Sequence, residues 1–312
     1  MLAIFLKTLP FFAVIGLGFG AGRTRFFNDE ATAYLTKFVF YFALSAMLFS
    51  FAANVDLSAN FSWSFVGAYR SATTLVWALV AGVALVRGAE TEAAVFEAHA
   101  GVIGNVGFLG IPMLDMLLGP AAVGPVLMVL SIDLTVFSTA LTLIITGRRE
   151  GRMRWSVLGV LGLGLVRNPM IVSVLLGLGW GASGWALPVP VNEFLMLLGA
   201  AATPCALFAI GASLAGRRAE RLGVAVWLSL AKLVLHPAAV ALAVWAFAVD
   251  PYAGAVMIAA AALPVAGNVF ILAQHYGVAP ARVSAAILIS TGTSVATVTV
   301  VLALVRFGMG IE

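Results

Sequence analysis

The sequence predicts an all-α polytopic membrane protein. Of its 312 residues, 62% are hydrophobic and only 10% are charged, and apolar runs recur along the whole chain. A helix needs roughly 20 mainly apolar residues to cross a bilayer, and the runs have that length. Two of them are interrupted midway by helix-breaking residues, at 104–112 and 263–269. A break at mid-membrane survives only where protein shields it or where it lines a polar cavity, so the pair predicts the binding site of a transporter.

Ten candidate membrane spans follow one another along the chain. They cover about residues 2–22, 32–53, 62–86, 94–118, 121–146, 157–181, 190–215, 222–248, 252–276 and 280–307. Arg167-Asn168-Pro169 interrupts the sixth, so residues 155–166 could lie along the membrane surface, with the crossing beginning near Asn168. The first run has no basic stretch before it and no small-residue cleavage site after it, and we expect it to be a retained helix.

Basic residues in the loops predict the orientation, because cytoplasmic loops carry an excess of Lys and Arg. Arginine follows every odd-numbered span, and the loops after the even-numbered spans hold neither residue. The loop arginines are Arg23, Arg25, Arg87, Arg148, Arg149, Arg152, Arg154, Arg217, Arg218, Arg221 and Arg282. The pattern places both termini outside in a multi-pass protein of the cell membrane. It also explains the net charge of +4, which therefore does not indicate nucleic-acid binding.

Two halves of five spans each are predicted, with residues 1–146 as the first repeat, 147–155 as a basic cytoplasmic linker and 156–312 as the second repeat. In each half the fourth span is interrupted and carries Gly-Asn-Val, and the fifth is rich in Ser and Thr. Because each half contains an odd number of crossings, similar halves must lie upside down relative to each other. The sequence thus predicts a 5+5 inverted repeat.

Six segments resemble, in order, the recurring motifs of the auxin efflux carrier family, which includes plant PIN-formed auxin exporters and bacterial malonate and malate carriers. They are Phe38-Val-Phe-Tyr-Phe-Ala-Leu44, the segment from Asn105 to Gly110-Ile111-Pro112, Arg167-Asn168-Pro169, Ala206-Leu-Phe-Ala-Ile-Gly-Ala-Ser-Leu214, Lys232-Leu-Val-Leu-His-Pro237 and Ala262-Leu-Pro264. The resemblance covers essentially the whole chain. It implies that the fourth and ninth spans cross at their broken midpoints, that anionic substrates bind beside the crossing, and that the protein forms a homodimer.

Asn105 in the first break matches an asparagine that the resemblance implies to be a substrate ligand. An amide can donate two hydrogen bonds to a carboxylate without a second buried charge. The alternative is that Asn105 only ties free backbone groups at the break. Gly104 and Pro112 complete this half of the predicted substrate site.

In the second break, Asn268 lies four residues after Pro264 and therefore shares its helix face. This departs from the plant pattern, which has no asparagine at that place and a second proline one residue later. Asn268 is either a substrate ligand or the source of an interhelical hydrogen bond. Pro264 itself is expected to be structural and to free the backbone carbonyl of Ala260.

Three ionisable residues near the middle of predicted spans are candidates for coupling transport to an ion. Asp133 lies in the fifth span, and intramembrane acids usually face the bundle interior and often carry protons or bind ions. Lys232 in the eighth span is its candidate partner, and His236 lies one turn further on, where it could shuttle protons. The alternatives are a static ion pair for the first two and a simple hydrogen bond for His236. His99 and His275 are expected at the cytoplasmic interface.

Several other classes of function are excluded or disfavoured. The single cysteine, Cys205, excludes an intramolecular disulfide, and no metal-ligand spacing is present. The string Gly16-Leu-Gly18-Phe-Gly20-Ala-Gly22 follows no strand and fits close helix packing better than a nucleotide loop. No paired nucleophile and base indicates an enzyme, and no cofactor is expected beyond a coupling ion, H⁺ or Na⁺.

The sequence therefore predicts a secondary transporter that moves a small organic anion across the lipid bilayer by alternating access. The alternatives are a channel or sensor on the same scaffold and a sodium-coupled symporter.

Overall fold

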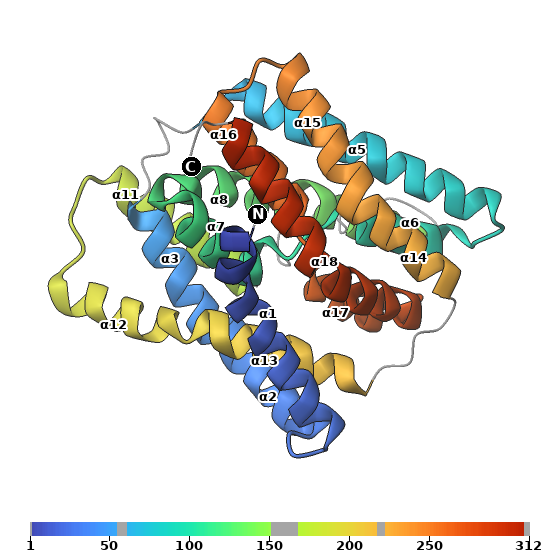
Figure 1. Cartoon of the computed structure of the whole chain (residues 1–312), viewed down its shortest axis with the longest axis horizontal. Coiled ribbons are helices and arrows are strands. Elements are labelled where there is room, and N and C mark those ends of the chain that lie inside the picture. Colours follow the sequence, from blue (N-terminus) through green and yellow to red (C-terminus); the bar gives the residue numbers. More distant parts are fainter. Residues whose placement is uncertain (1, 55–60, 151–167, 217–221, 309–312) are drawn as a thin grey trace.

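The computed structural model describes residues 2–54, 61–150, 168–216 and 222–308, and every regular element in these ranges is a helix (Figure 1). The first half contains α1 (Leu2–Arg23), α2 (Asp29–Phe38), η1 (Val39–Ala43), α3 (Leu44–Asn54), α5 (Trp63–Val86), α6 (Thr91–Val102), η2 (Val106–Gly110), α7 (Ile111–Leu118), η3 (Pro120–Ala122), α8 (Val123–Ile132), η4 (Asp133–Phe137) and α9 (Ser138–Glu150). The second contains α11 (Pro169–Ala182), α12 (Val189–Ala200), α13 (Ala202–Ala215), α14 (Leu222–Leu230), η5 (Ala231–Leu235), α15 (His236–Ala246), α16 (Pro251–Ala261), α17 (Gly267–Tyr276) and α18 (Pro280–Gly308).

Seven helical runs of the described chain are long and apolar enough to cross a membrane. Three shorter apolar helices accompany them, Val106–Leu118, Pro169–Ala182 and Pro251–Ala261. The all-helical, multi-pass membrane architecture is therefore confirmed. The count of ten crossings and the inverted repeat stay predictions.

The start of α11 agrees with the sequence. Asn168 is its N-cap, and the Asn168 side chain accepts a hydrogen bond from the Met170 amide at 3.0 Å. Pro169 follows as the first helical residue, where a missing N–H costs nothing. The helix thus begins where the interruption at 167–169 predicted, whereas residues 155–166, which could lie along the membrane surface, fall outside the described residues.

Helices α1 and α13 pack with their backbones in contact. A Cβ atom added to Gly18 would lie 2.1 Å from the carbonyl oxygen of Phe208, and one added to Gly211 would lie 1.9 Å from that of Ile15. Only glycine permits such an approach, which is the usual way in which membrane helices bring their backbones together.

Helices α11 and α3 repeat this arrangement. A Cβ atom on Gly177 or Gly181 would lie 2.6 or 2.9 Å from a carbonyl oxygen of α3. Gly177 and Gly181 have the same four-residue spacing as Gly18 and Gly22, which pack on α13. The interpretation of the first glycine string as a helix-packing device is confirmed for Gly18 and Gly22.

Four of the helical runs contain one turn of π-helix, and the sequence explains each. The turns η2 and η5 end two residues before Pro112 and Pro237, which have no N–H to continue an α-helical ladder. In η1 and η4 a serine hydroxyl donates to the backbone carbonyl five residues earlier. Ser45 donates to the carbonyl of Phe40 at 3.2 Å, and Ser138 donates to the carbonyl of Asp133 at 3.1 Å. π-Helical turns frequently mark functional sites.

Figure 1 shows α3, α11 and α12 at the left and α1, α2 and α13 at the bottom, whereas α5, α14 and α15 lie at the upper right. The glycine contacts of α1 with α13 and of α11 with α3 hold the helices at the left and bottom together.

Candidate functional site

The two breaks hydrogen-bond to each other. The amide of Asn105 donates to the carbonyl of Pro264 at 2.8 Å, and the amide of Ala266 donates to the carbonyl of Ile103 at 3.1 Å. Helix α6 ends at Val102 and α16 ends at Ala261, so these bonds join the two chain segments that have left their helices. Each break supplies the backbone partners that hydrocarbon could not supply.

The contact has the geometry of a single antiparallel β-bridge between Gly104 and Val265. The amide of Val265 donates to the hydroxyl of Ser290 on α18 at 3.1 Å. Gly104 is required by close packing, because a Cβ atom there would lie 3.2 Å from both Cε and Nζ of Lys232. The crossing is therefore braced by α18 on one side and by a lysine on the other.

Lys232 caps the end of α16. Its side chain is fully buried, and its ammonium group donates a hydrogen bond to the carbonyl of Ala261. That carbonyl has lost its usual partner, since the amide of Val265 bonds to Ser290 instead. The carbonyl of Ala260, which Pro264 was expected to free, accepts the amide of Leu263 at 3.3 Å. The cation thus lies at the negative end of the helix dipole, where it is most favourable.

Asn105 has an unsatisfied side chain beside the crossing. The residue is only 5% exposed, and its carboxamide oxygen is buried without a partner. The Asn105 backbone carbonyl accepts the amides of Leu109 and Gly110, at 3.1 and 3.0 Å. The main chain of Asn105 makes the hydrogen bonds that hold the break together. Its side chain is not needed for them and is available to a ligand.

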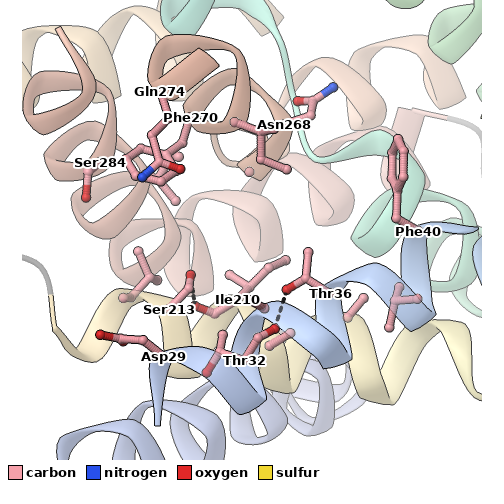
Figure 2. Close-up of a pocket in the computed structure, with 18 of the residues that line it drawn as sticks. Asp29, Thr32, Thr36, Phe40, Ile210, Ser213, Asn268, Phe270, Gln274 and Ser284 are labelled. Carbon is pink, nitrogen blue, oxygen red and sulfur yellow. Dashed lines mark hydrogen bonds between the residues drawn. The ribbon is translucent and has the colours of Figure 1, made fainter. Parts of the chain in front are cut away.

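A cleft of about 960 Å³ opens next to the second break, between α2 and α13 on one side and α17 and α18 on the other (Figure 2). Its lining includes the side chains of Thr36, Ser213, Asn268, Gln274 and Ser284, all of which are labelled in Figure 2. The cleft therefore offers many hydrogen-bonding groups between apolar walls, as small-molecule sites do.

The first turn of α17 faces this cleft with free amides. Gly267 and Asn268 both line the cleft, and neither backbone amide has an acceptor in the described part of the chain. No side chain caps this helix end, and the carboxamide oxygen of Asn268 also lacks a partner. An uncapped helix N-terminus attracts anions through both its N–H groups and its dipole.

Of the five predicted substrate residues, one reaches the cleft. Asn268 lines it, whereas Gly104, Asn105 and Pro264 form the crossing, and Pro112 is the second residue of α7. Two charged residues of the lining, Asp29 and Lys37, come from α2, which no ligand pattern in the sequence singled out. The only signal for them was their place in an amphipathic helix after a basic loop.

The carboxylate of Asp133 is buried and accepts one hydrogen bond. Only 2% of the residue is exposed, and the hydroxyl of Tyr69 donates to its Oδ1 at 2.8 Å. Its Oδ2 is buried without a partner. Asp133 and Lys232 do not form a direct ion pair: the three ion pairs within the described residues involve other groups.

Lys232 and His236 belong to the same buried group of side chains. Nζ of Lys232 lies 3.3 Å from Nδ1 of His236, and Nε2 of His236 lies 3.0 Å from Oγ1 of Thr73. The ring of His236 packs edge-on against that of Tyr69, with centroids 5.9 Å apart. The structure therefore brings all three predicted coupling residues together, and it adds Tyr69 and Thr73, which lie one turn apart on α5 and which the sequence did not single out.

The two remaining histidines differ in position. His275 is exposed near the end of α17, and its interfacial position stays a prediction. The same prediction is wrong for His99, which is fully buried in α6 with both ring nitrogens unpartnered. Only Ala98 separates His99 from Glu97, and both side chains are fully buried although they point to different sides of the helix. Closeness to the acidic loop along the chain therefore did not indicate exposure.

Two sets of ion pairs tie the ends of the broken helices on the side of the basic loops. Glu97 is fully buried and accepts hydrogen bonds from Arg87 and Arg282. Arg149 pairs with Glu92 at 2.9 Å and donates to the carbonyl of Tyr276, the last residue of α17. The hydrogen bond from Arg149 lowers the pKa of Glu92. No group of three or more His, Cys, Asp or Glu side chains within the described residues could hold a metal ion.

Comparison with known proteins identifies the family. The model of the family described as "Membrane transport protein" matches residues 3–302. The chain is 33% identical over 307 residues to a protein of Rhizobium meliloti (strain 1021) named "Putative malonate transporter", covering 96% of this chain and 95% of the relative. It is 25% identical over 299 residues to the "Uncharacterized transporter YfdV" of Escherichia coli (strain K12), covering 89% and 90%. The chain therefore belongs to the membrane transport protein family, the auxin efflux carrier family that its sequence motifs indicated.

Proposed function

We propose that this transporter is a secondary carrier of small carboxylates, with malonate-like dicarboxylates as its first candidate substrates, and that it works by alternating access at the crossing of the two broken helices. One observation carries the proposal: the uncapped N-terminus of α17, where the backbone amides of Gly267 and Asn268 have no acceptor in the described part of the chain, faces a cleft large enough for such an anion. The relative named as a malonate transporter supports the substrate class.

A carboxylate at this helix end would accept hydrogen bonds from the amides of Gly267 and Asn268. Broken helices in transporters present their positive ends to anionic substrate groups in the same way. Asn105, on the other strand of the crossing, is the second proposed ligand, and it would bind a carboxylate through its side-chain NH₂ group, because its buried Oδ1 can only accept. Lys37 on the opposite wall is a cation that a second carboxylate could approach.

The cleft opens on the side of the arginine-rich loops, since its lining includes Asp29 just after Arg25, Gly216 just before Arg217, and Ala281 beside Arg282. By the positive-inside rule this side is cytoplasmic. The conformation is then the inward-facing one, with both termini outside in the cell membrane. Dimerisation stays a prediction.

The matched glycine contacts support the inverted repeat. The first span of the first half packs on α13 through Gly18 and Gly22, and the first described helix of the second half packs on α3 through Gly177 and Gly181. In each half, the first helix would then pack against a helix of the other half. The ten-span arrangement with crossing fourth and ninth spans accounts for these pairs and for the hydrogen bonds between the breaks.

Coupling to protons is proposed to involve Asp133, Lys232 and His236. They are buried together, and Lys232 contacts the break directly. A sodium-coupled symporter on the same scaffold remains the alternative, because hydroxyls near the breaks, such as that of Ser290, could also coordinate Na⁺. A channel or sensor is the other alternative.

Reconstitution of the full chain in proteoliposomes tests the proposal. Uptake of radiolabelled malonate should saturate and should respond to an imposed pH gradient in sodium-free buffer. Flux that does not saturate would indicate a channel, and flux that requires sodium would indicate a symporter. Failure to transport or bind malonate and other small carboxylates would contradict the proposed function.

A further inference from the structure

The side chain of Tyr69 contacts two parts of the buried ionisable group that do not contact each other. Its hydroxyl donates to Asp133 at 2.8 Å, and its ring packs on that of His236, which in turn lies 3.3 Å from Lys232. Tyr69 is 1% exposed and sits on α5, whereas Asp133 and Lys232 lie in π-helical turns of two other helices.

We propose that Tyr69 is a positioning residue of the coupling site: it keeps Asp133 and Lys232 from closing into a permanent ion pair, so that the acid and the amine can gain and lose protons separately. The proposal rests on the proposed function, and it adds a residue that neither the sequence motifs nor the substrate cleft involves.

The contacts explain how the separation is maintained. Tyr69 satisfies Oδ1 of Asp133, and the carbonyl of Ala261 together with His236 satisfies the ammonium of Lys232. Each charged group thus has its own neutral partners. A buried acid and amine without such partners would gain most by pairing directly, because the attraction of opposite charges is strong away from water.

All titratable groups that act on the pair belong to this cluster. Tyr69 and Lys232 act on Asp133, and Asp133 and His236 lie nearest Lys232. Thr73 fixes the other ring nitrogen of His236 at 3.0 Å. Oδ2 of Asp133, which is buried and unpartnered, is the atom left free to receive a proton.

The proposal also links the proton to the break. Lys232 in its charged form holds the carbonyl of Ala261, the last residue of α16, and packs against Gly104 of the other break. When the amine loses its proton it also loses one donor and its charge. Its hydrogen bond to the carbonyl of Ala261 at the end of α16 then becomes weaker. Separate protonation of the two groups therefore provides a switch at the crossing, whereas a permanent ion pair would not.

Tyr69→Phe tests the proposal, because it removes the hydroxyl and keeps the ring. Tyr252→Phe is the matched control: the Tyr252 hydroxyl donates to the carbonyl of Leu118 at 2.9 Å, away from the cluster. Both variants are reconstituted with the full chain, and two rates are measured: malonate exchange between equal concentrations, and uptake driven by a pH gradient.

We expect Tyr69→Phe to exchange malonate at a rate within about fivefold of that of the unmodified protein, the usual net effect of one hydrogen bond. We also expect it to take up malonate equally with and without the pH gradient. Tyr252→Phe should keep its response to the gradient. Gradient-sensitive uptake by Tyr69→Phe equal to that of the control overturns the proposal. If the unmodified protein transports no carboxylate at all, it is the proposed function that fails.

An infrared measurement decides the matter without transport. The carboxyl band of Asp133 is assigned by subtracting the spectrum of Asp133→Asn, and its protonation is followed as the pH changes. The band should titrate in the unmodified protein and in Tyr252→Phe but stay ionised in Tyr69→Phe. Thr73→Val, which frees the ring of His236, is the second variant should Tyr69→Phe not fold. An Asp133 band that titrates unchanged in the folded variant overturns the proposal.

Discussion

Lys232 donates a hydrogen bond to the backbone carbonyl of Ala261, the residue at which the first half of a broken helix ends. The lysine comes from the π-helical turn η5, and its ammonium group also lies against Gly104 of the other break. One buried cation therefore contacts both interruptions. The relationship explains why a lysine is tolerated at a depth where charge is costly: it satisfies a carbonyl that has no other donor.

Replacing Lys232 by Met should destabilise the protein by about 1–3 kcal/mol, because it leaves a buried carbonyl without a partner. Transport should be lost as well. Thermal unfolding in detergent measures the first effect, and Lys7→Gln, at an exposed position of α1, is the control. Unfolding of Lys232→Met at the wild-type temperature would show that the hydrogen bond to Ala261 contributes nothing.

Asn105→Ala should weaken malonate binding by about 10–100-fold, the effect of losing hydrogen bonds to a charged group, while the purified protein stays folded. Asn268→Ala should have a similar effect if the carboxylate lies at the start of α17. Calorimetric titration of detergent-purified protein measures both. Unchanged affinity would remove the altered asparagine from the substrate site and leave it as a bracing residue of the crossing.

Asp133→Asn should uncouple transport from the pH gradient, because asparagine keeps the size of the side chain and cannot release a proton. Malonate exchange should continue, since Asp133 does not line the cleft. The measurement compares uptake with and without the gradient in proteoliposomes. If the response to the gradient persists, another group carries the proton.

The glycine contacts predict a contrast between neighbouring positions. Gly18→Ala and Gly177→Ala should each cost about 1–3 kcal/mol, because the added methyl group meets a backbone carbonyl. Gly16→Ala and Gly179→Ala should be nearly neutral, since no atom lies within 4 Å of the added Cβ. Thermal unfolding of the four variants checks this. Equal unfolding temperatures within each pair would contradict the proposed packing and weaken the case for a repeat.

Much of the fold was predictable because the membrane simplifies the rules. Apolar runs of the right length predicted helices, and Asn168-Pro169 predicted the start of α11. The mutual hydrogen bonds of the breaks follow from the need to satisfy every backbone group in hydrocarbon. The burial of Asp133, Lys232 and His236 together was also expected from the cost of isolated charge.

The rest depended on distances that no local pattern encodes. Tyr69 is one aromatic residue among many in apolar helices, and only the fold places its hydroxyl on Asp133. The burial of His99 was mispredicted because α6 is enclosed on all sides from Ala94 to Val102, and that depends on how other helices pack around it. The cleft wall formed by α2 was missed for the same reason: it depends on how two distant helices face each other.

The hydrogen bonds between Asn105 and Pro264 and between Ala266 and Ile103 also bear on how the chain assembles. Either half inserted into lipid alone would hold a segment with unmet backbone donors and acceptors. The ribosome completes residues 103–105 long before 264–266 exist, so the early segment needs a temporary partner, such as water or the insertion machinery. Folding of this protein is therefore complete only when residues 264–266 arrive to meet residues 103–105.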